Sequence, residues 1–242
     1  MPTVTVAPVL EVELSGAGGG WTAITADTRI GVESIVAEYG IRGGGPLDRV
    51  AATGTLTWAM NNGTGNSGGL QGYYSPGHVN ARSGWEIGIA VRLKITFGGT
   101  TYYKFRGTLV TVQPDPGLKQ QQAVTCMAVD WMDEAARTKM RNVGVQLNNR
   151  ADQIISTLVT NSITRQPSAT SYNVGQSTFT IALDNINEEQ ASVLQALSDL
   201  VMSEVGYLYV KGDTTQGGTL KFEDRHARPK AGSAVVTLNN TM

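Results

Sequence analysis

Apolar and polar residues alternate through much of this chain, and the clearest example covers residues 87–97. Every odd-numbered residue in that run is apolar, whereas the even-numbered ones include Arg92, Lys94 and Thr96. A period of two places the two sets on opposite faces of a β-strand. Gly98 and Gly99 follow immediately, and such a pair is typical of the tight turn of a β-hairpin. The chain is therefore constrained to fold back on itself as antiparallel β-structure.

The same alternation recurs along the first 129 residues. Further strands are predicted at residues 4–14, 21–25, 29–41, 55–60 and 102–112, and residues 122–129 are predicted to form a strand that is apolar on both faces; most of these segments are separated by glycine-rich turns. Seven or so strands within about 130 residues predict an antiparallel tube-like β-barrel or sandwich. The composition agrees, because the chain has 29 glycines and only 16% charged residues. That balance is typical of a turn-rich β protein whose faces are covered by neighbouring subunits.

The segment from Pro46 to Pro76 contains a strand and an unusually long loop. Leu56, Trp58 and Met60 share one face of the strand, so we expect them to be core residues. The loop that follows is longer than the usual hairpin connection of about 2–5 residues. We predict that it contacts a neighbouring subunit or ring. The residues expected to do so are Asn61, Asn62, Gly63, Asn66, Tyr73 and Tyr74.

The pattern changes at Asp130, where helical spacing begins. Residues 130–138 predict a short helix with Asp130 as its N-cap. Two further helices are expected where a capping residue precedes another polar residue by three positions. These pairs are Asn149 with Asp152, and Asn187 with Gln190, and Gly206 is expected to end the last helix.

Further alternating segments lie between and after these helices. They predict strands at residues 179–183, 207–210, 219–222 and 234–238. Helices and strands mixed in this way are typical of an α+β domain. The predicted fold is therefore mainly β with an α+β second half: a tube-like β-barrel or sandwich domain over residues 1–129 and a smaller α+β domain over residues 130–242. The second domain is expected to be the early part of a longer architecture.

Global properties exclude several classes of protein. The formal net charge is -1, so there is no overall positive field to hold nucleic acid. The single cysteine, Cys126, excludes an internal disulfide framework and a zinc site built from several cysteines. The sequence has no run of about 18 apolar residues, so we expect no membrane span. Its first residues have no basic region ahead of the apolar ones, so we expect no signal peptide.

Candidate catalytic residues are few. His78 and His226 are the only histidines, and neither has a second imidazole nearby in the sequence with which to build a metal site. Cys126 lies in a segment that is apolar on both faces, which predicts a buried thiol. The glycine-rich turns lack the Lys-Ser/Thr pair of a phosphate-binding loop. We therefore predict no catalytic, cofactor-binding or metal-binding residues, no cofactor and no enzymatic activity.

Two alternatives stay open. Asp130, Asp133 and Glu134 are explained as residues of a helix start, but a hydrolase would use such acids for acid–base chemistry. Aromatic side chains that stack on sugars would instead make the chain a carbohydrate-binding β-sandwich module involved in host recognition. The aromatic set comprises Trp21, Trp58, Trp85, Tyr73, Tyr74, Tyr102 and Tyr103.

Several short motifs follow one another in a particular order. They are T-A-D at residues 25–27, L-D-R-V-A at 47–51, Y-S-P at 74–76, V-R-L-K-I-T-F-G-G-T at 91–100, A-V-D-W-M-D-E-A-A-R at 128–137, G-Y-L-Y-V at 206–210 and T-L-K-F-E-D-R at 219–225. In this order and spacing, the chain resembles the minor tail and tail-tip (baseplate) hub proteins of long-tailed bacteriophages and prophages. The resemblance covers nearly the whole chain, and none of its motifs has a catalytic signature.

This resemblance implies a structural role in the virion. Proteins of the family form a ring, often a trimer, around the channel through which DNA and the tape-measure protein pass. We therefore expect a homo-oligomeric ring that closes or extends the distal end of the tail tube, with a trimer favoured and a hexamer as the alternative. The expected partners are the tube, distal tail, tape-measure and receptor-binding proteins, while DNA passes without specific binding and no membrane is involved. The expected location is the tail tip of the virion, after synthesis in the cytoplasm of the bacterial host.

Overall fold

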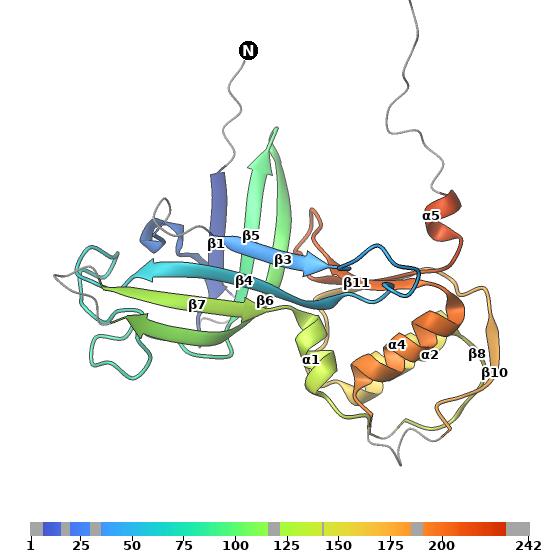
Figure 1. The fold of residues 1–242 in the computed structure, drawn as a ribbon. Helices are drawn as coiled ribbons and strands as arrows, with labels where there is room; N and C mark the ends of the chain where they lie inside the picture. Colours follow the sequence, from blue (N-terminus) through green and yellow to red (C-terminus); the bar gives the residue numbers. More distant parts are fainter. Residues whose placement is uncertain are drawn as a thin grey trace, which may run out of the picture.

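The computed structural model describes residues 7–15, 20–29, 35–115, 122–141, 143–184 and 191–230. Its first half holds one seven-stranded antiparallel sheet in the order β2-β1-β5-β6-β7-β4-β3 (Figure 1). A short 3-10 helix, η1 (Thr25–Asp27), follows the second strand. The strands are β1 (Ala7–Glu13), β2 (Trp21–Ala23), β3 (Val36–Gly40), β4 (Ala52–Asn61), β5 (Ala90–Phe97), β6 (Thr100–Asp115) and β7 (Ala123–Val129).

Strand β6 turns the corner of this sheet. Its residues 100–108 pair with β5, and its residues 108–115 pair with β7. Figure 1 shows β5 and the start of β6 standing roughly across the direction of β3, β4 and β7. The pairing shifts by one residue at Lys104 against β5 and at Val110 against β7, and such bulges bend a strand and increase its twist. Gly107 lies between the two shifts, where a Cβ atom would come within 2.1 Å of the Val129 carbonyl oxygen.

The bend divides the sheet into two arms: one contains β2, β1, β5 and the first part of β6, and the other contains the second part of β6, β7, β4 and β3. The two arms enclose one apolar core. Leu56, Trp58 and Met60 are at most 1% exposed, as the alternation predicted. They pack in a single cluster with residues of the other arm, such as Leu10 and Val91. Residues from both arms therefore share one interior, as in a sandwich.

The described residues do not form a closed barrel. Strands β2 and β3 lie at opposite edges of the sheet order and do not pair in the part of the chain that the structure describes. The segment after β2 partly bridges the gap, because Thr28 pairs with Met60 and the Arg29 N–H donates to the Ala59 carbonyl oxygen over 3.0 Å. A mainly β chain with an α+β second half is confirmed, in the form of a strongly bent open sheet.

The second half combines helices with short strands. Strand β12 pairs antiparallel with β11 and parallel with β9, and β8 pairs antiparallel with β10. Helices α2 and α4 contribute much of a second apolar cluster beneath the three-stranded sheet. The elements are α1 (Trp131–Arg137), β8 (Gln146–Arg150), α2 (Ala151–Ser162), β9 (Ala169–Tyr172), β10 (Thr178–Ala182), α4 (Val193–Glu204), β11 (Tyr207–Lys211), β12 (Thr219–Glu223) and α5 (Ala227–Lys230).

Backbone hydrogen bonds join the two halves. The Ala51 N–H donates to the Leu208 carbonyl oxygen over 2.8 Å, and the Leu208 N–H donates to the Arg49 carbonyl oxygen over 2.9 Å. Tyr103 of β6 and Asp213 exchange a second pair of backbone bonds. Ala51 also belongs to the apolar cluster of the helices. The residues just before β4 thus belong to the first half in sequence but pack against the second half. The predicted domain boundary between residues 129 and 130 therefore stays a prediction.

One predicted helix start differs from the structure. Helix α2 follows Arg150, whose N–H donates to Gln153 Oε1, whereas Asn149 lies in β8 and pairs with Phe179. Long-range strand pairing therefore overrides the local capping signal. The described helix α4 has Ser192 as its N-cap, whose hydroxyl oxygen accepts from the Gln195 N–H, whereas the helix start predicted at Asn187 lies outside the described residues.

Some predictions lie outside the described residues, and others were incomplete. Strands β8 and β9 have no clear alternation and were not predicted, since both are held by partners far along the chain. The Asn187 and Gln190 capping pair, the last predicted strand at residues 234–238 and the first residues of the first predicted strand are not described.

Helix α4 ends in an uncommon conformation. Val205, rather than the expected Gly206, takes the left-handed region, with φ 59° and ψ 27°. A β-branched residue is a genuine outlier there, at a cost of about 1–2 kcal/mol. Gly206 is needed for a different reason, because a Cβ atom would lie 2.6 Å from the Glu223 carbonyl oxygen. The Val205 side chain is 43% exposed, so little packing offsets the strain.

This strain predicts the effect of Val205→Gly. Glycine adopts the left-handed region without a steric penalty, so the free energy of unfolding should stay the same or rise by up to about 1 kcal/mol. The matched control is Val174→Gly, because Val174 is 60% exposed and has no positive φ. It should lower the free energy of unfolding by roughly 0.5–1 kcal/mol. Urea denaturation followed by circular dichroism measures the free energy of unfolding of both variants. Equal losses of stability would contradict backbone strain at Val205.

Candidate interaction site

The loop between β4 and β5 folds back onto the protein instead of extending from it. Asn62, Gly63, Asn66 and Tyr74 are buried, and only Asn61 and Tyr73 of the predicted contact residues are partly exposed. The loop is rich in glycine and asparagine, a composition that does not by itself indicate such packing. The structure shows that buried polar side chains hold this loop in place.

Tyr74 is the centre of that arrangement. Its hydroxyl donates to a carboxylate oxygen of Asp27 in η1 and accepts from Arg82 Nη1 over 3.0 Å. Its backbone carbonyl accepts from Trp85 Nε1 over 3.0 Å, and its ring meets the Trp85 ring edge to face. Burial, and then the hydrogen bond to Asp27, raise the pKa of the Tyr74 hydroxyl. Tyr74 therefore remains a neutral donor at physiological pH.

Asp27 also ties down the first part of the loop. Its two carboxylate oxygens accept from the Ser67 N–H over 2.8 Å and from the Ser67 hydroxyl over 2.5 Å. Asn66 acts in the same region, where its side-chain amide donates to the carbonyl oxygens of Gly63 and Leu70. Asn62 accepts from the Tyr74 N–H and donates to the Ser75 hydroxyl. Buried polar groups that are satisfied in this way make one loop conformation specific.

The outer surface of the loop is a different set of residues. Leu70 is 45% exposed and Val79 is 92% exposed, whereas Asn62, Asn66 and Tyr74 are buried. Thr64 and Gln71 are also exposed. Contacts of this loop with another molecule would use exposed side chains such as these, because the buried polar ones are already paired within the chain.

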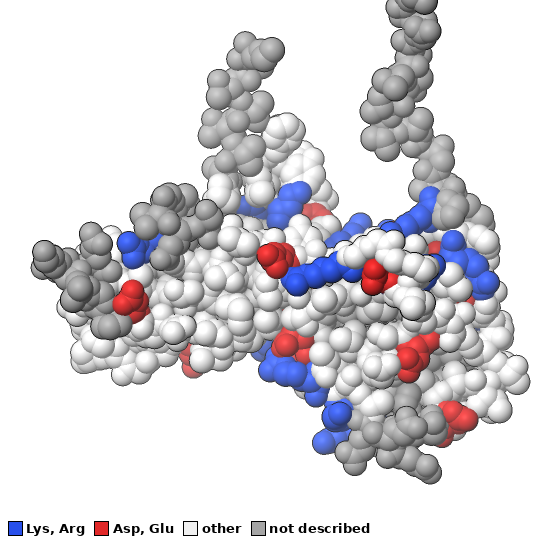
Figure 2. Space-filling model, in the orientation of Figure 1, with Lys and Arg blue, Asp and Glu red and all other residues white. Residues whose placement is uncertain are grey.

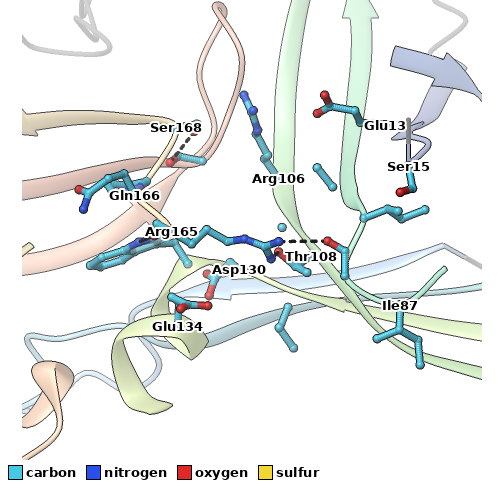
Figure 3. A pocket seen from close by; sticks show the side chains of 18 of the residues that line it. Glu13, Ser15, Ile87, Arg106, Thr108, Asp130, Glu134, Arg165, Gln166 and Ser168 are labelled. Carbon is cyan, nitrogen blue, oxygen red and sulfur yellow. Dashed lines mark hydrogen bonds between the residues drawn. The ribbon is translucent and has the colours of Figure 1, made fainter. Parts of the chain in front are cut away.

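A cleft lined by both polar and apolar residues lies between the two halves of the chain. It has a volume of about 550 Å³ and is lined by the end of β1, the start of β5, the middle of β6, α1 and residues 165–168. Figure 3 shows Arg165 reaching across it, where its guanidinium donates to Thr108 Oγ1 over 2.7 Å and to the Gly88 carbonyl oxygen over 3.1 Å. The Arg165 carbonyl in turn accepts from Trp131 Nε1. Arg165 therefore fastens the α+β half to the sheet.

Asp130 lies buried in the wall of this cleft (Figure 3). One of its carboxylate oxygens accepts from the Met132 N–H over 3.0 Å, which confirms Asp130 as the N-cap of α1. The other oxygen is buried and has no hydrogen-bond partner in the described residues. Burial raises the pKa of Asp130 to about 6. This carboxyl is thus explained by helix capping, with one oxygen left in an unfavourable environment.

Other candidate residues are placed as structural ones. Cys126 is fully buried, and burial raises the pKa of its thiol. His78 and His226 are both exposed, in a loop and in the turn after β12. Among the described residues, no three or more His, Cys, Asp or Glu side chains gather closely enough to hold a metal ion. None of the helices in the described part is long and apolar enough to cross a membrane.

Most of the predicted aromatic set is buried or lies against a guanidinium group, whereas Tyr102 is exposed. Trp58, Trp85 and Tyr74 are buried. Trp21 is covered by the guanidinium of Arg92, whose Cζ lies 4.1 Å from the ring centroid. Arg92 also lies over the ring of Tyr103. No observation therefore favours the carbohydrate-binding alternative over the structural one.

Comparisons with known proteins agree on the fold. No family model and no curated protein sequence matches the chain. Among solved structures, the 43 kDa tail protein of prophage MuSo2 from Shewanella oneidensis is similar, with a TM-score of 0.53 and 13% identity over 90% of this chain and 54% of that one. The tail protein from Neisseria meningitidis gives a TM-score of 0.54 and 10% identity over 89% and 50% of the two chains.

A third structure, the half-lidded Francisella PdpA-VgrG complex, gives a TM-score of 0.50 and 10% identity over 90% of this chain and 31% of that one. The chain spans about half the length of the two tail proteins. Its structural neighbours are thus phage and prophage tail proteins, and the resemblance expected from the sequence is confirmed at the level of the fold.

Removing the Tyr74 hydroxyl tests the organisation of the loop. Tyr74→Phe should lower the free energy of unfolding by about 1.5–3 kcal/mol, because it removes hydrogen bonds to the charged groups of Asp27 and Arg82 in a buried site. Tyr73→Phe is the matched control, since the Tyr73 hydroxyl makes no hydrogen bond within the described chain and should change stability by less than about 0.5 kcal/mol. Urea denaturation measures the free energy of unfolding of both variants. Equal losses would show that the Tyr74 hydroxyl does not hold the loop in place.

Asp130→Asn tests the buried carboxyl. Because the pKa of Asp130 is raised from 3.8 to about 6, the folded protein keeps a proton that the unfolded chain loses, so this group's contribution to stability falls as pH rises from about 4 to about 6. Asparagine keeps the capping oxygen and does not ionise. The unfolding free energy of the variant minus that of the wild type should therefore increase by about 3 kcal/mol between pH 3.5 and pH 7.5. A difference that is the same at both pH values would contradict the assignment.

Proposed function

We propose that the chain is a structural protein of a bacteriophage tail tip, where it forms a ring that closes or extends the distal end of the tail tube around the DNA channel. The observation that carries this proposal is the shared fold, which extends over about nine-tenths of the chain in two tail proteins. The proposed ring is homo-oligomeric, with a trimer favoured over a hexamer. Its neighbours are the tube, distal tail, tape-measure and receptor-binding proteins.

Physical features of the chain support this role. The edge strand β3 presents exposed Val36 and Tyr39 side chains at the open side of the sheet. Edges of this kind are normally covered, and in a ring the next subunit covers them. The net charge of -1 suits a protein that surrounds passing DNA without holding it.

The proposal is tested by imaging the purified protein with and without co-expressed tail tube protein. Negative-stain electron microscopy should show rings coaxial with the tube, and mass photometry should give three or six copies per ring. A chain that stays a monodisperse monomer at high concentration would contradict the ring. Glycan-array binding that is lost on Tyr73→Ala would instead support the carbohydrate-binding alternative.

Within this role, the loop before β5 is proposed to contact the neighbouring subunit through its exposed apolar residues. Val79→Asp should reduce ring formation at least tenfold, because a carboxylate would be desolvated in the contact. The melting temperature should change by less than about 1 °C, since Val79 is 92% exposed in the single chain. Val79→Ile keeps an apolar contact and is the matched control. Unchanged ring formation by Val79→Asp in mass photometry would show that the loop lies outside the interface.

A further inference from the structure

One exposed surface combines apolar and cationic side chains around a single tyrosine. It lies where the turn before β4 meets the end of α4, the start of β11 and α5. Figure 2 shows Lys and Arg side chains gathered along the edge of the molecule that carries β11 and α5 in Figure 1. We call it the Tyr207 surface, and its residues are Leu47, Arg49, Val205, Tyr207 and Arg228.

Two guanidinium groups lie against Tyr207. The Cζ atom of Arg228 is 3.7 Å from the ring centroid, and that of Arg49 is 4.9 Å from it. Arg49 donates to the carbonyl oxygens of Val205 and Pro46, and it has no carboxylate partner in the described residues. Arg228 shares the buried Glu223 carboxylate with Lys221. The site therefore holds cationic groups whose charge is only partly compensated.

The stacked geometry leaves these cations ready to bind a carboxylate. A guanidinium that lies against an aromatic ring keeps its N–H groups in its own plane, where they can meet a carboxylate in a bidentate manner. Only Nε of Arg228 is engaged with Glu223, and Arg49 uses Nε and Nη1 for backbone carbonyls. Nη2 of Arg49 has no acceptor among the described residues, and the terminal N–H groups of Arg228 have none there apart from the Tyr209 hydroxyl.

Apolar side chains lie beside these cations. Leu47 is 74% exposed at the tip of its turn, and the Arg49 N–H donates to its carbonyl oxygen. Val205 is exposed in a strained left-handed conformation that glycine would adopt without strain. Backbone strain at an exposed position, where the side chain contributes little to the fold, is a feature of functional sites.

We infer that the Tyr207 surface docks a protein segment that presents a carboxylate beside an aliphatic side chain. The carboxylate would bind the free N–H groups of Arg49 and Arg228, and the aliphatic side chain would pack on Leu47 and Val205. Tyrosine and arginine are the residue types that dominate binding energy in protein interfaces. The inference deepens the proposed tail role on which it rests, since it assigns a surface through which the chain meets another tail protein.

A nucleic acid fits this surface less well. Binding of single strands depends on bases stacking on aromatic faces, and the Tyr207 ring is already covered by guanidinium groups. The local charge is also modest, because Lys221 and Arg228 share the Glu223 carboxylate and Asp48 adjoins Arg49 in the sequence, which leaves one positive charge in excess. Leu47 and Val205 are exposed apolar residues, and their side chains cannot form hydrogen bonds or ion pairs with the phosphates of a polynucleotide.

Fluorescence anisotropy with the full chain tests the inference. The probe is a fluorescein-labelled peptide with three repeats of Glu-Leu-Glu-Gly, compared with Glu-Gly and Lys-Leu-Lys-Gly repeats of equal length and with a 12-nucleotide single-stranded DNA. The Glu-Leu peptide should bind at least fivefold more tightly than the other three. Val205→Gly and Arg228→Glu should each weaken it at least fivefold, whereas Val174→Gly and Lys139→Glu, at exposed positions elsewhere, should not. Bound peptide should slow hydrogen exchange at residues 46–51 and 205–210.

Three results would overturn the inference. These are no preference for the Glu-Leu peptide, tighter binding of the DNA, and equal losses in the control variants. The outcome is separable from that of the ring proposal. If rings form but the peptide does not bind, only the docking inference is contradicted. If the peptide binds a protein that stays monomeric, the ring proposal is contradicted and the docking inference is supported.

Discussion

The fold depends on one strand that pairs with two different neighbours along its length. Strand β6 hydrogen-bonds to β5 in its first part and to β7 in its second, with a one-residue shift in each pairing. Because both ladders have to be satisfied, the sheet bends sharply at the middle of β6. The bend brings the apolar faces of its two arms together, and a single core forms between them.

The long loop adds a polar centre to that apolar core. Its residues lack the apolar alternation of a strand, yet Tyr74 and Trp85 are buried with the core. This burial is stable because Asp27 and Arg82 form hydrogen bonds with the Tyr74 hydroxyl, and because Asp27 also accepts a hydrogen bond from Ser67 in the first part of the loop. A loop that is built in this way presents a defined outer surface, and Leu70 and Val79 lie on it. The buried polar network therefore stabilises the fold and also shapes the proposed contact surface.

Two energetically unfavourable features lie at the junction of the two halves. Asp130 keeps one buried carboxylate oxygen without a partner, and Val205 takes a conformation that β-branched residues avoid. Both residues lie at the start or end of a helix next to the crossing segments of the other half. Arg165 and the backbone bonds at Leu208 hold that junction together. The cleft and the Tyr207 surface are both consequences of how the halves meet.

Local sequence determined much of the secondary structure. The alternation around Trp58 and Val91, the Gly98–Gly99 hairpin and the Asp130 cap all depend on residues close together in the chain, so each was predictable. Strand β8, the inward direction of the loop and the pairing of Asp27 with Tyr74 depend on partners tens of residues away. Propensity carries no information about such pairings. Tertiary structure alone decided them, because a buried polar group or an unpaired strand edge is stable only where the folded chain supplies its partner.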